Sequence, residues 1–187
     1  MEVELNWPQE QPALDDGELV LRPWRSDDAD AVYRACQDDQ IQRYTMVPVP
    51  YLPEHAVHYV EVVGPVGYAG RTEALFAVTA RSSGDVLGSC GLVTIDLANQ
   101  VGYAGYWIAP WARQRRVASQ ALELVTAWAL SQLGLGTVYL EIEPDNAASV
   151  GTARLAGFTM KKGPPVQREH RGAVREFNLY ERTRPGR

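Results

Sequence analysis

The sequence predicts one mixed α/β domain built on a single sheet, and three observations support this fold class. Two apolar runs, near 74–80 and 86–96, are joined by the turn Arg81-Ser82-Ser83-Gly84-Asp85, which is typical of a hairpin. A strand, a helix and a second strand then follow one another between 101 and 143. A helix of that length connects parallel strands, and such connections are almost always right-handed. A last hairpin, from 158 to 180, completes the sheet.

The first part of the chain predicts a lead-in, a short strand and two helices. Residues 1–17 look like a loose lead-in, and 18–22 alternate as a short strand closed by a proline. Ser26 can cap a helix. Two aspartates follow in its first turn, where negative charge interacts favourably with the positive end of the helix dipole. Pro53 suits the first turn of a second helix to about residue 63, and we expect the glycine-rich stretch 64–70 to break it.

The second part predicts the crossover helix and a shorter one. An apolar stripe indicates a helix from about Arg116 to Leu133, and Gly134 stands where a helix-ending glycine is expected. A strand follows at 137–143, and Asp145 or Asn146 can cap a short helix to about residue 156. No linker divides the chain. We therefore expect one domain over residues 18–182, with a lead-in at 1–17 and a tail at 183–187.

Composition narrows the classes of function. The 187 residues are 45% hydrophobic and 22% charged, with a formal net charge of −5. Sequence-independent nucleic-acid binding needs an excess of Lys and Arg, so no nucleic-acid partner is expected despite a local arginine cluster. No apolar run approaches the roughly 20 residues that span a bilayer, and the acidic N-terminus is unlike a signal peptide. We expect a cytoplasmic protein with no membrane contact.

The cysteines and histidines do not predict a metal site. Cys36 and Cys90 each stand in an apolar stretch and match no metal-ligand spacing, so buried thiols are expected. His55 and His58 are three residues apart on the second helix, but no third ligand stands at a telling distance. With His170 in the last hairpin, these histidines suit the surface or an acceptor groove better than a metal.

The segment from Tyr106 to Ser119 is the most informative one. It reads as a strand end, a basic loop and a helix start, with three arginines in the loop. The first-turn N–H groups of a helix have no internal partner and lie at the positive end of the dipole. Together with guanidinium groups they form a site for phosphate or pyrophosphate. The residues alone also allow a solvated basic loop.

A second set of polar residues follows the neighbouring strand. It runs Glu143-Pro144-Asp145-Asn146-Ala147-Ala148-Ser149. The ends of adjacent parallel strands open on the same edge of the sheet, where ligands of α/β proteins tend to bind. By themselves, Asn146 can be only a helix cap and Ser149 only a first-turn residue.

These segments resemble the GNAT superfamily of N-acetyltransferases, in the branch of the ribosomal-protein-alanine acetyltransferases. The resemblance covers residues 18 to 180 and implies the GNAT fold: a mixed, mostly antiparallel central sheet with a splayed parallel strand pair and helices on both faces. Its motifs keep the family's order and spacing: Leu19-Val20-Leu21-Arg22-Pro23-Trp24, Asp27-Asp28-Ala29-Asp30-Ala31, Val86-Leu87-Gly88-Ser89-Cys90-Gly91-Leu92, Gly105-Tyr106-Trp107-Ile108-Ala109-Pro110, Asn146-Ala147-Ala148-Ser149 and Leu155-Ala156-Gly157-Phe158.

The resemblance implies acetyl-coenzyme A as the cosubstrate. The family signature Gln/Arg-x-x-Gly-x-Gly/Ala reads Arg113-Gln114-Arg115-Arg116-Val117-Ala118, so Arg116 replaces the central glycine. Either Arg116 points outward and adds a cation, or it crowds the phosphate cradle. We expect the first, because the first turn of a helix suits a non-glycine residue. The implied coenzyme-binding residues are Trp107, Ile108, Ala109, Arg113, Gln114, Arg115, Arg116, Val117, Ala118, Ser119 and Asn146.

The resemblance also implies direct attack of an amine on the acetyl thioester. Ser149 matches the family's serine and is the candidate acid that protonates the departing thiolate. The position where other branches carry a tyrosine is Ala153 here, and Tyr103 stands where a carboxylate is common. The candidate base is therefore Glu143, with Glu176 and a water relay as alternatives.

The acceptor is expected to be a primary amine of a protein N-terminus or of a small molecule, and the aromatic-rich stretch 44–68 either forms its site or packs on the sheet. A longer acyl donor, such as succinyl, is an alternative within the class. A non-catalytic coenzyme-binding or interaction module is the alternative outside it, because the signature glycine is absent. The protein is expected to be a monomer or a homodimer.

Overall fold

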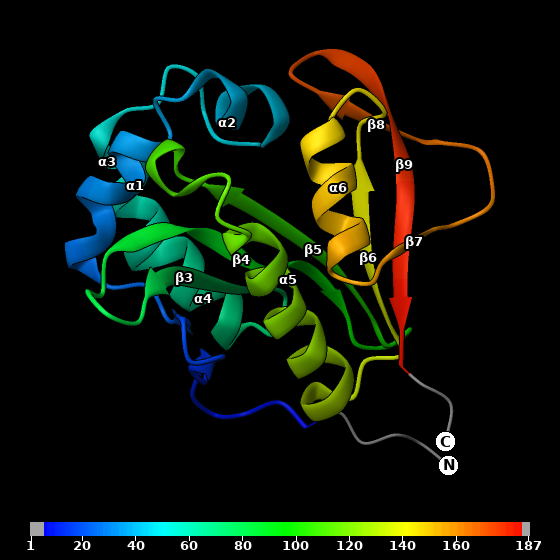
Figure 1. Cartoon of the computed structure of the whole chain (residues 1–187), viewed down its shortest axis with the longest axis horizontal. Coiled ribbons are helices and arrows are strands. Elements are labelled where there is room, and N and C mark those ends of the chain that lie inside the picture. The colour runs from blue at the N-terminus through cyan, green and yellow to red at the C-terminus, as the bar shows by residue number, and fades with distance from the viewer. Residues whose placement is uncertain (1–5, 185–187) are drawn as a thin grey trace.

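The computed structural model describes residues 6–184 and shows one nine-stranded sheet (Figure 1). The strands follow the order β1-β2-β3-β4-β5-β6-β9-β7, and β8 pairs with β9 beside this path. Their bounds are β1 Leu14–Asp15, β2 Leu19–Arg22, β3 Ala74–Ala80, β4 Val86–Asp96, β5 Val101–Ile108, β6 Thr137–Ile142, β7 Thr159–Met160, β8 Val166–His170 and β9 Ala173–Thr183. Both predicted hairpins are present.

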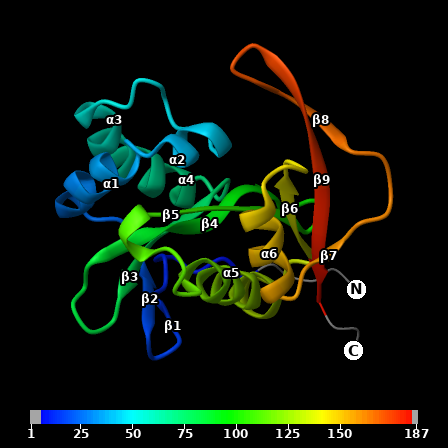
Figure 2. The ribbon, with the colours of Figure 1, turned by 45° about the horizontal axis from the view of Figure 1, so that its top comes forward.

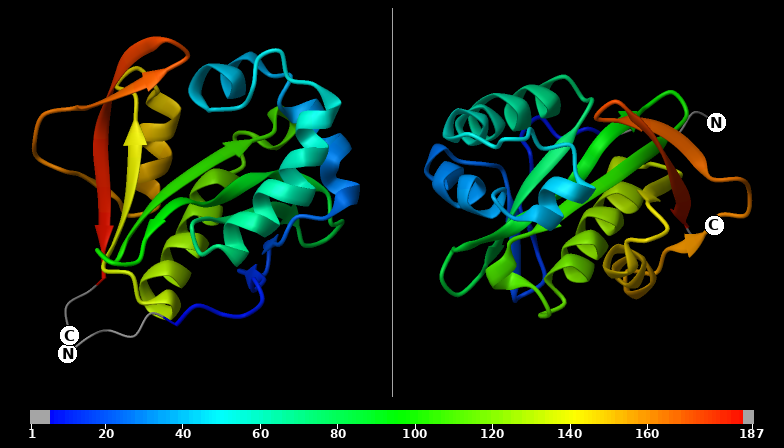
Figure 3. Two further views of the ribbon diagram at one scale, coloured as in Figure 1. Left: turned by 180° about the vertical axis from the view of Figure 1, so that it is seen from behind. Right: turned by 90° about the horizontal axis from the view of Figure 1, so that it is seen from above.

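The sheet contains one parallel pair, β5 with β6, and the other pairs are antiparallel. The parallel register runs only from Val101↔Thr137 to Tyr103↔Tyr139. Beyond Tyr103 the two strands separate, as the left view of Figure 3 shows. The expected mixed sheet with a splayed parallel pair is therefore confirmed. The splay opens toward the C-terminal ends of both strands.

Helices cover both faces of the sheet (Figure 2). Helices α1 to α4 lie over one face of β3, β4 and β5, while α5 and α6 lie on the other. Each layer has its own apolar core, one around Val32 and Val60 and the other around Leu122 and Trp128. The helices are α1 Ala29–Ala35, α2 Asp39–Tyr44, α3 Pro53–His58, α4 Gly64–Ala69, α5 Val117–Trp128 and α6 Ala147–Leu155, with short 3₁₀ turns η1 Ser26–Asp28 and η3 Pro110–Ala112.

Helix α5 is the predicted crossover helix. It continues through a π-helical segment, η4 (Ala129–Leu133), and ends at Gly134, whose φ of 86° is the left-handed conformation expected of a C-terminal glycine. The ring of Trp128 meets that of Phe76 edge-on at 5.5 Å. Burial of this side chain fixes α5 against the middle of the sheet.

The predicted helix break at 64–70 is wrong. Helix α3 passes through the π-helical segment η2 (Tyr59–Val63) into α4 without interruption. The N–H of Gly64 donates to Tyr59 O, an i→i+5 bond, so Pro65 and its missing N–H follow a turn where the bonding pattern already shifts. Gly67 serves packing, since a Cβ there would lie 2.8 Å from the Cβ of Glu73.

The segment expected to be a loose lead-in takes part in the fold. Leu14 pairs with Leu21, which adds the short strand β1 to the edge of the sheet. Trp7 packs on Tyr68 with ring centroids 4.8 Å apart, and the Tyr68 hydroxyl donates to the carbonyls of Pro8 and Glu10. The sequence also gave no sign of α2, a short helix that lies close to the functional site.

Candidate active site

The open edge of β5 is the first component of the site. The N–H of Ala109 donates to Leu87 O of β4 at 2.9 Å. Because backbone groups alternate in direction along an antiparallel strand, those of Tyr106 and Ile108 are directed to the side of β6. β6 no longer pairs with β5 at this level. The splay therefore presents strand-type donors and acceptors to a ligand.

A hydroxyl pair spans the same gap. The Tyr106 Oη on β5 lies 2.7 Å from the Ser149 Oγ on α6, and either oxygen can be the donor. Asn146 holds this end of α6 in place, since its Oδ1 accepts the Ser149 N–H at 3.1 Å as the helix cap. Burial raises the pKa of Tyr106 to about 12, although hydrogen bonds with Ser149 and Thr152 work against the shift. The phenol therefore stays protonated at neutral pH.

The loop from Ala109 to Val117 forms the other component. Two of its residues adopt left-handed backbone conformations, Gln114 with a φ of 62° and Arg116 with a φ of 60°. Arg116 is the N-cap of α5 and not a first-turn residue. The expectation that its backbone would suit a non-glycine residue is thus wrong, because a Cβ is disfavoured in this region. The family's glycine has a conformational reason at this position.

The start of α5 is suited to binding an anion. The side chain of the N-cap residue, Arg116, makes no capping hydrogen bond. The N–H groups of the first turn therefore receive no acceptor from it. Left-handed residues such as Gln114 and Arg116 are typical of the concave runs of N–H groups that bind anions. Arg115 and Arg116 are exposed beside the helix start, and the outward orientation of Arg116 relative to the coenzyme stays a prediction.

Arg113 lies elsewhere than the coenzyme signature suggests. Its guanidinium forms two hydrogen bonds with Asp38, 2.6 Å from Nη2 to Oδ1 and 3.2 Å from Nη1 to Oδ2. Its Nε also donates to Ile108 O at 3.3 Å. Asp38 is at the same time the N-cap of α2, where it accepts the N–H groups of Gln40 and Ile41. Arg113 thus connects the end of β5 to α2.

Glu143, the candidate base, is held in an ion-pair cluster. Its carboxylate accepts from Arg43 Nη1 at 2.9 Å and from Arg175 Nη1 at 3.1 Å, and Arg43 also pairs with Asp145 at 3.3 Å. Burial opposes ionisation of Glu143, but the hydrogen bonds from both arginines outweigh it and lower its pKa. A carboxylate stabilised in this way is a weak proton acceptor. This geometry argues against Glu143 as the base.

The remaining predicted residues fall into two groups. Trp107, Ile108, Ala109, Val117 and Ser119 are buried in the strand end and the helix start. The Ser119 hydroxyl donates to Arg116 O at 2.9 Å and supports the turn. Gln114 is exposed and Ala118 is half-buried. Glu176, the alternative base, is exposed and faces Gln167 across the β8–β9 hairpin.

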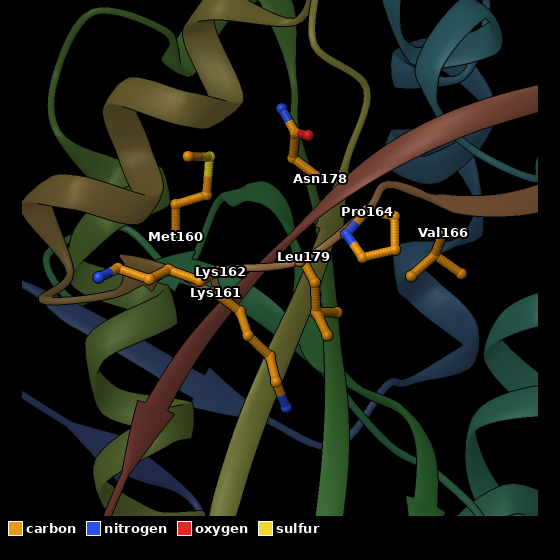
Figure 4. Close-up of a pocket in the computed structure, with 8 residues that line it drawn as sticks. Met160, Lys161, Lys162, Pro164, Val166, Asn178 and Leu179 are labelled. Carbon is orange, nitrogen blue, oxygen red and sulfur yellow. The ribbon is translucent and has the colours of Figure 1, made fainter.

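A pocket of about 260 Å³ lies apart from these residues, around the loop that follows β7 (Figure 4). Met160, Lys161 and Lys162 line one side of it, and Asn178 and Leu179 of β9 line another. Lys161 is engaged with the Tyr139 hydroxyl at 3.2 Å. The pocket contains none of the residues that the sequence predicted for the site.

Four residues of the site were not found by sequence reasoning. Tyr106 belongs to the motif that runs from Gly105 to Pro110, but only its contact with Ser149 across the gap identifies it as a residue of the site. Asp38, Arg43 and Arg175 reach the site from α2 and β9, which are far away in sequence. Within residues 6–184, acidic side chains, cysteines and histidines form no group of three that could hold a metal ion. In the same range, every helix is too short or too polar to cross a bilayer.

Comparison with known proteins agrees with this architecture. Residues 18–159 match the family model described as the acetyltransferase (GNAT) domain. The uncharacterised N-acetyltransferase YoaA of Bacillus subtilis is 23% identical over 175 residues, which are 93% of this chain and 98% of YoaA. Two solved structures share the fold. RimL, a ribosomal L7/L12 alpha-N-protein acetyltransferase in complex with coenzyme A, superposes with a TM-score of 0.81 at 19% identity, over 92% of this chain and 98% of RimL.

The second structure is the ribosomal-protein-S5-alanine acetyltransferase of Vibrio fischeri. It gives a TM-score of 0.77 at 13% identity, over 92% of this chain and 97% of that protein. Both structures are of the branch that the sequence motifs resemble. The family model covers well over half of the chain, and the splayed strands and the start of α5 have the arrangement that the resemblance implied. The chain belongs to the GNAT family of acetyltransferases.

Proposed function

We propose that this protein transfers an acetyl group from acetyl-coenzyme A to a primary amine, by direct attack of the amine while both substrates are bound. The observation that carries the proposal is the uncapped start of α5 next to the open edge of β5. The helix start binds anionic phosphates. The strand edge binds an amide-rich arm in the way that it would bind an additional strand. Acetyl-coenzyme A contains both groups.

The donor side uses backbone groups more than side chains. First-turn N–H groups at Val117, Ala118 and Ser119, with the cations of Arg115 and Arg116, hold the phosphates. The backbone of Tyr106 and Ile108 orients the pantetheine arm, and an N–H of this strand polarises the acetyl carbonyl. Trp107 and Ala109 are buried at the strand end, Arg113 donates to Ile108 O, and Asn146 caps α6, so these residues support the frame. Acetyl-coenzyme A supplies the activated acetyl group and a thiolate leaving group.

Ser149 is the proposed acid. Its hydroxyl lies in the gap, and its hydrogen bond with Tyr106 lets the phenol return a proton after the serine has donated one. The phenolate then regains a proton from the water that has taken the proton of the amine. Tyr106 suits this task because it is fully protonated at neutral pH. Proton removal from the amine is assigned to water, since the ion pairs of Glu143 keep that carboxylate occupied.

The acceptor approaches from the face of the sheet that carries α1 to α4. In the core under this face, the buried Trp24 stacks on Trp107 at 6.4 Å, and the Tyr59 hydroxyl pairs with that of Ser89 at 2.9 Å. RimL is named for acetylation of a ribosomal-protein N-terminus. By that likeness a protein N-terminus is the proposed acceptor, with a small-molecule amine as the second choice. The cytoplasmic location and a monomeric or dimeric state stay predictions.

Calorimetry with coenzyme A and a thiol-release assay test the proposal in two steps. We expect micromolar binding of acetyl-coenzyme A, and release of free thiol with at least one member of a panel of N-terminal peptides and small amines. Succinyl-coenzyme A in the same assay tests the longer acyl donor. Binding without turnover across the panel would favour a non-catalytic coenzyme-binding module. Failure to bind any acyl-coenzyme A would reject the donor site itself.

A further inference from the structure

The ion pair between Asp38 and Arg113 joins two elements that belong to different sides of the site. Arg113 is in the donor loop that follows β5, and Asp38 begins α2. The contact is bidentate, and both side chains are partly buried, at 32% exposure for Arg113 and 19% for Asp38. Paired, partly desolvated ions of this geometry are stronger than ordinary surface salt bridges.

The other end of α2 is fastened across the splay. Arg43 in its last turn pairs with Glu143 at 2.9 Å and with Asp145 at 3.3 Å, just beyond the end of β6. Arg171 in the β8–β9 turn donates to the carbonyls of Gln42 and Val47 at the end of α2 and beyond it. Figure 1 shows α2 between the ends of the central strands and this hairpin. The short helix thus spans the opening between β5 and β6.

We infer that Asp38 is a positioning residue for the donor site and that α2 is the strap through which the two sides of the splay are coupled. The inference rests on the proposed function, because it assumes that the donor loop binds the coenzyme phosphates. Arg113 then contributes to binding without touching phosphate. Its role is to fix the loop whose N–H groups and arginines do.

The backbone conformation of the loop after β5 requires support from neighbouring residues. Gln114 and Arg116, which follow Arg113 directly, both adopt left-handed conformations that side chains disfavour. Such conformations persist only where the surroundings over-determine them. On the other side of Arg113, the Trp111 indole donates to Val86 O at 3.1 Å and Ala112 is buried. Ser119 supports Arg116 from within α5, and Asp38 supports the loop from another element, through Arg113.

Asp38→Asn removes the charge that pairs with Arg113 but keeps the cap of α2, because asparagine is as good a helix cap as aspartate. We expect the Kd of coenzyme A, measured by calorimetry, to rise five- to tenfold in this variant. Arg113→Gln should weaken binding to a similar extent. The double variant should bind no worse than the weaker single one, since both remove the same contact. The matched control is Asp30→Asn, which removes the exposed Asp30–Arg34 pair of α1 and should leave the Kd unchanged.

S-acetylpantetheine, which has no phosphate, separates positioning of the loop from a general loss of structure. We expect kcat/KM with this donor to stay within twofold of the wild type in Asp38→Asn, and to fall with acetyl-coenzyme A. Equal losses with both donors would overturn the inference. Tighter coenzyme binding in Asp38→Asn would also overturn it, since a released Arg113 would then be a phosphate ligand.

The far end of α2 tests the coupling. Arg43→Gln removes the contacts with Glu143 and Asp145, and we expect a two- to threefold higher Kd for coenzyme A. An unchanged Kd would reject α2 as a strap. These results are read against wild-type binding of coenzyme A. If the wild type does not bind it, the proposed function fails, whereas wild-type binding with an insensitive Asp38→Asn rejects this inference alone.

Discussion

The hydroxyls of Tyr106 and Ser149 lie 2.7 Å apart across a gap that backbone hydrogen bonds no longer close. Tyr106 belongs to β5 and Ser149 to α6, which follows β6. The pair therefore joins the two parting sides of the sheet at the place where the proposed reaction occurs. A hydroxyl that gives up a proton here has a second hydroxyl from which to recover it.

The first prediction concerns this pair. Ser149→Ala should lower kcat about a hundredfold, a typical effect of removing a positioned acid, with little change in the KM of acetyl-coenzyme A. Tyr106→Phe should lower kcat about tenfold, because Ser149 remains but loses its proton source. Both are measured by thiol release with the amine found in the panel.

Arg154→Ala serves as the control for this pair, because Arg154 is an exposed residue of the same helix and lies outside the hydroxyl network of Tyr106. Its kcat should stay within twofold or threefold of the wild type. Unchanged turnover in Ser149→Ala would remove the serine from the mechanism, whatever the result for Tyr106→Phe.

The second prediction concerns the backbone of Arg116. Arg116→Gly removes a Cβ from a left-handed residue and should stabilise the fold by about 1 kcal/mol. For a chain of this length the melting temperature rises by about 3 °C. The same change deletes a cation beside the phosphates, so the Kd of coenzyme A should rise severalfold. Stability and affinity then move in opposite directions, which thermal unfolding and calorimetry show separately.

Gln114→Gly is the matched control, since Gln114 has the same left-handed backbone without a charge. It should gain similar stability and keep its affinity. Tighter binding of coenzyme A in Arg116→Gly than in Gln114→Gly would show that Arg116 crowds the cradle.

The third prediction is the pH dependence of Glu143. Its folded-state pKa is lowered from the ordinary value of 4.5, because the hydrogen bonds from Arg43 and Arg175 outweigh the effect of burial. Its contribution to stability is therefore complete above pH 4.5 and is lost as the pH falls through the folded-state value. Urea unfolding from pH 6 down to pH 3 should show a steeper loss in the wild type than in Glu143→Gln.

The variant should also be less stable at neutral pH by about 2 kcal/mol, since Arg175 loses its ionic partner and Arg43 keeps only Asp145. If Glu143 were the base, Glu143→Gln would instead abolish turnover at a pH where the variant is still fully folded. The pH profile of kcat in that variant distinguishes the two roles.

The fourth prediction concerns Arg171, which donates to the carbonyls of Gln42 and Val47. Arg171→Ala should expose the chain near residues 42–47, and hydrogen exchange of their amides should accelerate about tenfold. Arg168→Ala is the control, because Arg168 lies on the same hairpin but pairs with Glu141 of β6 and not with α2. Equal exchange in both variants would show that the hairpin does not hold this segment.

Much of the fold could be predicted because local patterns and packing agree. The strands β3, β4 and β6, the helix α5 and the glycine after it follow from apolar runs, helical periodicity, and turn and end signals. The continuous helix through Gly64 and Pro65 could not be predicted. A π-helical turn before Pro65 places its missing N–H where no α-helical hydrogen bond is needed. Gly67 looked like a breaker but is required by the close approach of Glu73.

The site was predictable where it depends on backbone and less so where it depends on distant partners. The start of α5 and the cap at Asn146 follow from local sequence. Arg113 pairs with Asp38, and Glu143 pairs with Arg43 and Arg175. These contacts join segments that are 32 to 100 residues apart. No local pattern reports such contacts, so the sequence alone left Arg113 and Glu143 free for roles that the geometry gives to other groups.

Three residue pairs are the whole hydrogen-bonded register between β5 and β6. The strands on either side of that register are paired over much greater lengths, β4 with β5 on one side and β6 with β9 on the other. The domain therefore consists of two stiff plates that meet at a narrow hinge line. The angle between the plates can change without breaking a ladder inside either one. We expect α2 to fix this angle, because its ion pairs join the end of β5 to the end of β6.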